Sequence, residues 1–230
     1  MSSVAAANGE TTTLAKERKA IVFLHGLGDT PRGWSSLPQQ FQQVGNDELE
    51  QYNIEYVFPP APQAPVTISG GQLQTSWFDI FDWPISLQAR DDPKGLLESV
   101  HKTTLLLDKL VQSGIKPSNI ILGGFSQGGA VALLTSWRYP QTLAGTICLS
   151  GWMMLKEEFA QAKKVDNNTP CFWGHGSADP VVLPEQVPVG VALLKENGID
   201  VSMEMYSGMG HSSCPQEIRD VLDFVKSRFK

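Results

Sequence analysis

Short apolar runs alternate along this chain with segments whose apolar residues recur every three to four positions. The runs are rich in β-branched residues and are apolar almost throughout, which is typical of parallel strands covered on both faces. We predict six strands, at residues 20–24, 54–58, 120–124, 145–150, 170–174 and 201–206.

The segments between these runs predict helices that cover the strands. An apolar stripe runs from Leu96 to Leu110 at a spacing of 3.6 residues, and Gly114 follows it as a stop signal. Residues 130–137 are apolar on nearly every face, which predicts a buried helix, and residues 218–229 form the stripe of a last helix. Strands that alternate with helices indicate βαβ units. The predicted fold is therefore of the α/β class, with a mostly parallel central sheet and helices on both faces.

Residues 59–92 interrupt this rhythm, because they contain five prolines, two glycines and four aromatic residues. A loop of this length inside a domain is usually a lid or a binding loop. The alternative is a surface excursion that covers one edge of the sheet. We expect the aromatic side chains of this loop to be exposed; they are Trp77, Phe78, Phe81 and Trp83.

Composition and charge narrow the class of protein. The 230 residues suit one domain, which we place at residues 18–230 behind a flexible N-terminal segment 1–17. A net charge of −6 without a basic cluster argues against nucleic-acid binding. No apolar run approaches the ~20 residues of a membrane span. The three cysteines lack disulfide or metal-ligand spacing, and no phosphate-loop motif is present, so we expect a cytoplasmic protein without metal or cofactor.

The strongest chemical signal is a G-x-S-x-G pentapeptide from Gly124 to Gly128, with Ser126 at its centre. It follows a predicted strand and precedes a predicted helix, which is the context of a nucleophile elbow. Such a turn accepts only small residues on either side of the serine, and it aims the hydroxyl at a helix N-terminus. The alternative is an ordinary glycine-rich turn between a strand and a helix.

A serine nucleophile needs a base, and the base needs a carboxylate that orients it. In hydrolases with this elbow the chain order is serine, acid, histidine. His211 directly follows the last predicted strand, whereas His175 ends its own strand and can brace the turn after it. Asp179 follows a strand at the carboxyl edge of the sheet, while Asp166 and Asp200 precede strands at the opposite edge. We therefore predict His211 as the base and Asp179 as the acid.

Two backbone N–H groups are needed to bind an oxyanion. We assign one to Gln127, which follows the nucleophile, and the other to Leu27, in the glycine-rich loop after the first strand. His25 lies in the same loop and precedes the nucleophile, so we expect it to be a structural hydrogen-bonding residue. His101 falls within a predicted helix, where we expect it at the surface.

These motifs resemble the acyl-protein thioesterase, lysophospholipase and carboxylesterase family of small α/β-hydrolases. The resemblance runs from about residue 20 to the C-terminus, through FLHGLGD at 23–29, PAP at 60–62, PVT at 65–67, SWFDI at 76–80, GGFSQGG at 123–129, HG at 175–176, DP at 179–180 and GMGH at 208–211. It implies the α/β-hydrolase fold and the hydrolysis of acyl thioesters and esters. It also implies a triad of Ser126, Asp179 and His211, with Leu27 and Gln127 as oxyanion donors.

The chain departs from the family pattern at two places. The family's His-Gly-Asp-x-Asp reads HGSAD at residues 175–179, so the first acid is missing while the triad position remains. The N-terminal cysteine that some members carry for lipid anchoring is also absent, since Ser2 and Ser3 follow Met1. We therefore expect at most transient contact with a membrane.

An acyl tail needs apolar side chains near the serine. We assign this role to Trp77, Phe78, Trp152 and Val181, although each of them fits equally well in the core. The partner is then an acylated protein or a lipid or ester substrate, and exposed loop aromatics permit a homodimer. Two alternatives stay open: a broad short-chain carboxylesterase, and a non-catalytic binding module that keeps the hydrolase fold.

Overall fold

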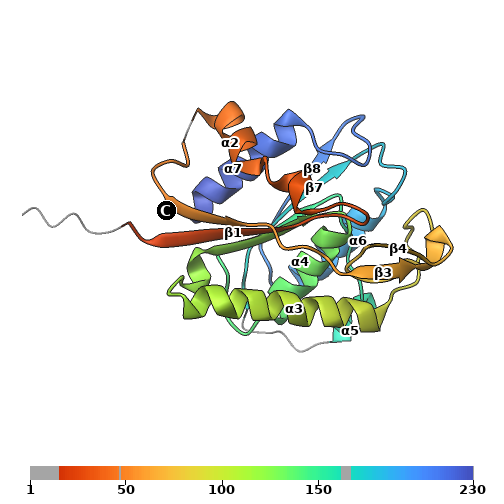
Figure 1. Cartoon of the computed structure of the whole chain (residues 1–230). Coiled ribbons are helices and arrows are strands. Elements are labelled where there is room, and N and C mark those ends of the chain that lie inside the picture. Colours follow the sequence, from red (N-terminus) through yellow and green to blue (C-terminus); the bar gives the residue numbers. More distant parts are fainter. Residues whose placement is uncertain (1–15, 47, 162–166, 230) are drawn as a thin grey trace, which may run out of the picture.

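A six-stranded sheet forms the centre of the molecule (Figure 1). The computed structural model describes residues 16–46, 48–161 and 167–229, so the expected flexible segment falls almost entirely outside the described residues. The strand order is β2-β1-β5-β6-β7-β8, and all neighbouring strands are parallel. The six predicted strands are confirmed as β1 Arg18–Leu24, β2 Asn53–Val57, β5 Ile120–Phe125, β6 Gly145–Leu149, β7 Cys171–Gly176 and β8 Val201–Tyr206.

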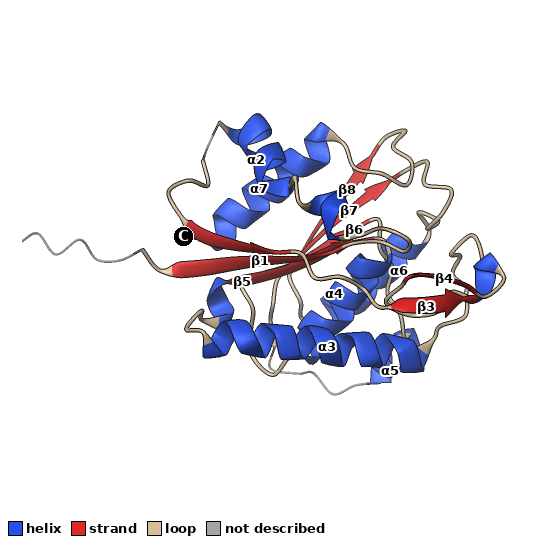
Figure 2. Ribbon diagram, in the orientation of Figure 1, coloured by secondary structure: helices blue, strands red, loops and turns tan. Residues whose placement is uncertain are grey.

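The helices form one layer on each face of this sheet (Figure 2), which confirms the predicted three-layer arrangement. One face carries α1 Pro31–Trp34, α2 Leu37–Gly45 and α7 Pro215–Arg228. The other carries α3 Pro93–Gln112, α4 Gln127–Arg138, α5 Lys156–Gln161 and α6 Gln186–Glu196. Among the described residues, no helix combines the length and the apolar composition that crossing a membrane requires.

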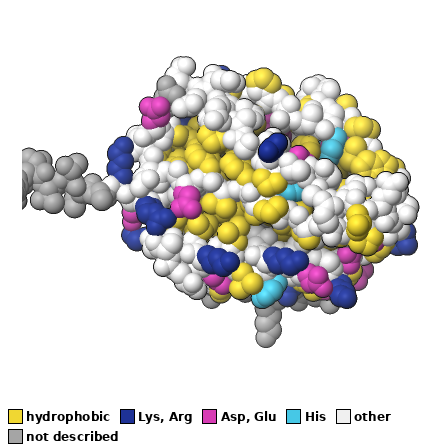
Figure 3. All heavy atoms as spheres, in the orientation of Figure 1, with side chains coloured by type: hydrophobic (Ala, Val, Ile, Leu, Met, Phe, Trp, Pro, Cys, Tyr) yellow, Lys and Arg dark blue, Asp and Glu magenta, His cyan; other side chains and the backbone are white. Residues whose placement is uncertain are grey.

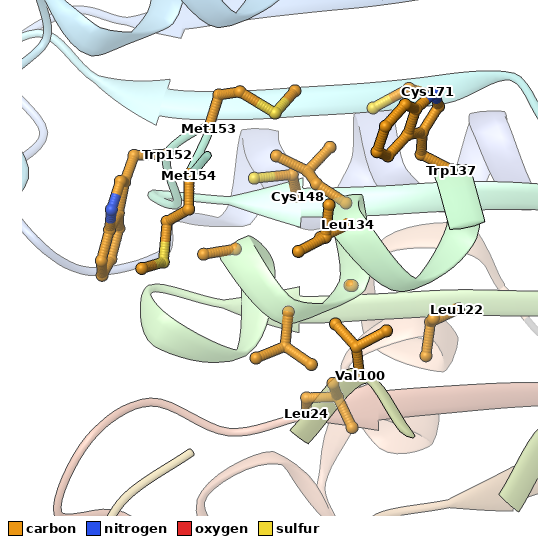
Figure 4. Close-up of a cluster of buried hydrophobic side chains, with 14 of the residues drawn as sticks. Leu24, Val100, Leu122, Leu134, Trp137, Cys148, Trp152, Met153, Met154 and Cys171 are labelled. Atoms are coloured by element: carbon orange, nitrogen blue, oxygen red, sulfur yellow. The ribbon is translucent and has the colours of Figure 1, made fainter. Parts of the chain in front are cut away.

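Alternation along β1 divides the apolar interior into two cores, because successive side chains of a strand point to opposite faces. Val22 and Leu24 face the layer of α3 and α4, whereas Ile21 and Phe23 face the layer of α2 and α7. Figure 4 shows part of the first core, where α4 lies against the sheet. Every residue of α4 up to Trp137 is buried, which confirms the buried helix predicted at residues 130–137.

The predicted helices correspond to α3, α4 and α7. The Asp92 carboxylate caps α3 by accepting a hydrogen bond from the Gly95 N–H at 3.0 Å, and the predicted stripe of α3 is buried. Helices α1, α2, α5 and α6 were not predicted. The first three have at most nine residues and give few repeats of the 3.6-residue period, although Thr30 before Pro31 is a helix-start signal for α1. α6 contains Pro188 and Gly190, which are typical of breaks in a helix.

The segment 59–92 is more ordered than the predicted loop. It contains an antiparallel hairpin of β3 Gln63–Val66 and β4 Gln72–Thr75, joined through a short 3-10 helix, Thr67–Ser69. The expectation of exposed aromatics is wrong for Trp77 and Phe78, which are only 5% and 4% exposed. It holds for Trp83, which is 53% exposed. The difference arises because residues 76–78 are hydrogen-bonded to the side chain of Gln127, the first residue of α4.

Charged side chains are scattered over the face of the molecule that Figure 3 shows. Figure 3 shows Lys and Arg side chains separated from one another on the viewed face, with Asp and Glu side chains between them and apolar side chains near its centre. The viewed face therefore carries no single large basic patch.

Candidate active site

The turn between β5 and α4 has the backbone of a nucleophile elbow. Ser126 stands in it with φ 54° and ψ −120°, a conformation that residues other than glycine seldom adopt. A Cβ atom on Gly124 would lie 2.3 Å from the carbonyl carbon of Gly128. One on Gly128 would lie 2.3 Å from the Leu24 carbonyl oxygen. Only glycine fits at these two positions, which explains why the pentapeptide carries them.

Three side chains from three loops meet above the carboxyl edge of the sheet. The Ser126 hydroxyl oxygen lies 2.9 Å from Nε2 of His211, and Nδ1 of His211 lies 2.8 Å from Oδ2 of Asp179. Because a carboxylate only accepts hydrogen bonds, Nδ1 carries the imidazole proton and Nε2 is left to accept one. The three residues follow β5, β7 and β8, whose carboxyl ends lie at one edge because the strands are parallel.

The Asp179 carboxylate is buried but well supplied with donors. Its Oδ1 accepts hydrogen bonds from the N–H groups of Val181 at 2.8 Å and Val182 at 3.0 Å, while Oδ2 faces His211. Burial opposes ionisation, but the hydrogen bonds from His211 and from the two amides outweigh it, so the pKa of Asp179 lies below its ordinary value. The group is therefore an anion that can hold and stabilise an imidazolium.

The two other histidines near the site have structural contacts. His175 is fully buried and donates from Nε2 to the Val182 carbonyl at 2.9 Å, so it braces the turn after its strand. Burial lowers the pKa of His175, which keeps its imidazole neutral. His25 accepts a hydrogen bond from the Ala61 N–H at 3.1 Å and donates to the Gly26 carbonyl at 2.8 Å. Its expected structural place is confirmed.

Two backbone amides are available beside the serine. Gln127 is the first residue of α4, where N–H groups have no partner inside the helix. Within the described part of the chain, no hydrogen-bond acceptor faces the Leu27 N–H either. Gly26 approaches so closely that a Cβ atom on it would lie 3.4 Å from the Ser126 Cβ. The loop of Leu27 is therefore held against the elbow.

The Gln127 side chain binds the segment that carries two predicted acyl-binding residues. Its Oε1 accepts from the Trp77 N–H at 2.9 Å, and its Nε2 donates to the Ser76 hydroxyl at 3.0 Å and the Phe78 carbonyl at 2.6 Å. Trp77 also donates from its indole to the His25 carbonyl at 2.7 Å. Sequence reasoning did not foresee this bracing, which ties residues 76–78 to the elbow and explains their burial.

A mainly apolar cavity of about 170 Å³ opens beside Ser126 and His211. Of the predicted acyl-binding residues, Trp152 and Val181 line it, and so does Leu27. Trp77 and Phe78 are not among its lining residues. Phe78 instead packs edge-on against Trp152, with ring centroids 5.8 Å apart, and so supports the wall from behind.

The cavity has further lining residues that the site prediction did not include. They come from the long segment after the hairpin, from the elbow, from the loop after Asp179 and from the loop of Leu27. They are Ile80, Trp83, Ile85, Phe125, Val182, Gly26 and Asp29. The apolar character of these residues was visible in the sequence, but nothing local separated a cavity wall from core. Among the described residues, no cluster of three or more His, Cys, Asp or Glu side chains is placed to hold a metal ion.

Comparisons with known proteins show the family to which the chain belongs. The family model described as phospholipase/carboxylesterase matches residues 11–228. Acyl-protein thioesterase 1 of Saccharomyces cerevisiae is 39% identical over 217 residues, which cover 91% of this chain and 92% of the relative. The crystal structure of Arabidopsis thaliana SOBER1 superposes with a TM-score of 0.85 at 34% identity, covering 93% of this chain and 100% of that one.

A second solved relative is Zea mays acyl-protein thioesterase 2, with a TM-score of 0.77 and 29% identity, covering 94% of this chain and 96% of that one. The family match extends over nearly all of the described sheet and helices, and over the loops that carry Ser126, Asp179 and His211. The chain belongs to the phospholipase/carboxylesterase family of α/β-hydrolases.

Proposed function

We propose that this protein is a serine hydrolase that cleaves acyl thioesters and oxygen esters through an acyl-enzyme. Ser126 is the nucleophile, His211 the general base and acid, and Asp179 the carboxylate that orients His211. One observation carries the proposal: hydrogen bonds run unbroken from Ser126 through His211 to Asp179, and Ser126 and His211 line an apolar cavity.

In the first half-reaction the Ser126 oxygen attacks the acyl carbonyl carbon while Nε2 of His211 takes its proton. Negative charge moves to the carbonyl oxygen, where the Leu27 and Gln127 N–H groups bind it. Asp179 stabilises the imidazolium. The C–S or C–O bond to the leaving group then breaks, and His211 returns its proton to the departing thiol or alcohol.

In the second half-reaction a water molecule gives a proton to His211 and attacks the acyl carbon. The same two amides bind the oxyanion, the bond to Ser126 breaks, and the serine recovers its proton. A carboxylic acid leaves. No step changes an oxidation state, and His211 carries out each of the proton transfers.

The apolar cavity indicates that the protein recognises the acyl chain of its substrate. Its walls are largely apolar side chains, so burial of methylene groups there is favourable. Similar proteins named acyl-protein thioesterase support an acylated protein as the substrate, while the family description supports lipid esters and carboxylic esters. The two classes share the acyl group and differ in the leaving group.

The test is hydrolysis of matched thioesters and oxygen esters of increasing acyl length, combined with fluorophosphonate labelling. We expect turnover of both classes and a single covalent label on Ser126. Preference for acetyl over all longer chains would favour a short-chain carboxylesterase. A protein that binds acyl esters without turnover and without labelling would be a non-catalytic module, and the proposal would be wrong.

A further inference from the structure

The peptide group between Val181 and Val182 lies between the catalytic acid and the cavity wall. Its N–H, which belongs to Val182, donates to Oδ1 of Asp179 at 3.0 Å. Its carbonyl, which belongs to Val181, accepts from the Ile85 N–H at 2.7 Å. One peptide group therefore separates the Ile85 backbone from the Asp179 carboxylate, and hydrogen bonds in such a chain polarise one another.

The next peptide group repeats the connection. The Leu183 N–H donates to the Ile85 carbonyl at 3.0 Å, and the Val182 carbonyl accepts from His175 at 2.9 Å. Ile85 and Val182 thus form a parallel β-bridge outside the main sheet. The bridge fixes both residues whose amides hold Asp179, although Ile85 is nearly one hundred positions away in the sequence.

The same residues form the cavity wall. Ile85, Val181 and Val182 are lining residues of the cavity, together with Ser126 and His211. Ile85 is 3% exposed, so neighbouring residues cover most of it and only a small part of it borders the cavity. An acyl chain bound to Ser126 would therefore lie next to the bridge that positions Asp179.

Resting on the proposed function, we propose that Ile85 is a positioning residue that makes turnover depend on acyl length. An acyl chain long enough to contact Ile85 gains that contact only when the bridge is closed, so it favours the arrangement in which Asp179 is held. Binding energy from a remote part of the substrate then appears in kcat and not only in KM. A chain too short to reach Ile85 leaves the bridge unsupported.

The experiment measures kcat and KM separately for acetyl and octanoyl nitrophenyl esters, at concentrations below micelle formation. We expect the wild-type kcat to be larger for octanoyl than for acetyl by on the order of tenfold, since small displacements of catalytic groups cost this much or more. In Ile85→Ala the ratio of the two kcat values should fall toward one. Ile85→Val should give an intermediate ratio.

Ile80→Ala is the matched control. Ile80 lines the same cavity and comes from the same long segment, but its carbonyl accepts from the Ile68 N–H near the hairpin, not from the acid loop. It should raise the octanoyl KM and keep the ratio of kcat values. If Ile85→Ala does not fold, Ile85→Val against Ile80→Val makes the same comparison.

The outcomes separate this inference from the function on which it rests. If Ser126→Ala abolishes turnover but Ile85 variants change KM alone, Ile85 is an ordinary binding contact and the inference is wrong. The inference is also wrong if the wild-type kcat does not rise with acyl length. Absence of Ser126-dependent turnover in the wild type would instead overturn the proposed function, and the inference with it.

Discussion

Ser126 shows how a single residue is held in an unfavourable backbone conformation for the sake of its side chain. Its positive φ costs on the order of 1–3 kcal/mol, and such strain persists only where the surroundings enforce it. Two hydrogen bonds hold the Ser126 backbone in this conformation. The Ser126 N–H donates to the Leu149 carbonyl at 2.8 Å, and the Ser126 carbonyl accepts from the Ala130 N–H at 3.1 Å. The strained turn lifts the hydroxyl to His211.

Replacing Ser126, the proposed nucleophile, tests the proposed function directly. We expect Ser126→Ala to lower kcat by on the order of 10⁶, because the members of a triad act as a unit. The fold should be retained, since alanine adopts the same backbone at similar cost. The measurement is steady-state hydrolysis together with fluorophosphonate labelling of both proteins. Labelling that persists in the variant would place the nucleophile elsewhere.

The acid of the triad can be tested without removing its volume. Asp179→Asn should lower kcat by about 10⁴, because the amide holds His211 in the wrong tautomer. Asp200→Asn is the control: Asp200 is exposed and precedes β8 at the opposite edge of the sheet. Its kcat should match that of the wild type. A large loss in the control with none at Asp179 would refute the acid assignment. Asp166, the other rejected acid, lies outside the described residues.

At the scale of one element, α7 carries a buried carboxyl group in its first turn. Glu217 is fully buried, and within the described residues neither of its oxygens has a hydrogen-bond partner. It lies against β7, where a Cβ on Gly174 would be 2.5 Å from its Oε1. Burial, with a smaller contribution from the charge of Asp220, raises the pKa of Glu217 to about 8. The group is therefore protonated in the folded protein at neutral pH.

This residue should make stability depend on pH. Between its ordinary pKa of 4.5 and about 8, the unfolded chain loses the Glu217 proton while the folded chain keeps it. The free energy of unfolding therefore falls as pH rises through this window. The free energy of unfolding of Glu217→Gln should therefore fall by about 2–4 kcal/mol less than that of the wild type between pH 5 and pH 8. Urea denaturation of both proteins at the two pH values measures this, and parallel pH dependences would contradict it.

The elbow depends on a second element through Gln127. Gln127→Met removes three hydrogen bonds to residues 76–78 and leaves the buried Trp77 N–H unpaired, while the Phe78 carbonyl still accepts from the Ser76 hydroxyl at 2.6 Å. We expect the free energy of unfolding to fall by about 1–3 kcal/mol, because leaving one buried group unpaired costs about that much. Gln39→Met on the exposed side of α2 is the control. Equal urea midpoints for the two variants would show that the bracing contributes little.

For the whole molecule, the sequence revealed the features that depend on local signals. Strands and long helices have distinct periods, and Ser126, Asp179 and His211 each follow a strand, so the topology of a parallel sheet was enough to bring them to one edge. The glycines on either side of Ser126 likewise predicted the tight turn between a strand and a helix. Each of these features can be read within a few residues of the chain.

The cavity could not be predicted in the same way, because its walls depend on contacts between distant segments. Trp77 and Trp83 are both aromatic residues of one irregular segment, yet one is buried under α4 and the other is exposed at the cavity. No periodicity fixes side-chain direction in such a segment. Ile85 gains its place from a bridge to Val182, a pairing that no local pattern announces.

The assembled cavity leads to a prediction about acyl length. Four methylene groups moved from water into apolar surroundings contribute about 3 kcal/mol, or on the order of 10² in kcat/KM. We expect kcat/KM to rise from acetyl to octanoyl esters. Trp152→Ala should flatten this rise more than it slows acetyl hydrolysis, because Trp152 lines the cavity. A preference for acetyl in the wild type would favour the short-chain carboxylesterase.

The order of the active groups along the chain has a consequence for biosynthesis. Ser126 and the oxyanion loop precede His211, by 85 residues in the case of the serine. At a synthesis rate of about 5–20 residues per second, His211 is added roughly 4–17 s after Ser126. β8 must then leave the ribosome and pair with β7 before the His211 loop is placed. A growing chain thus contains Ser126 for several seconds before it contains the proposed base, and the proposed deacylation cannot take place during that interval.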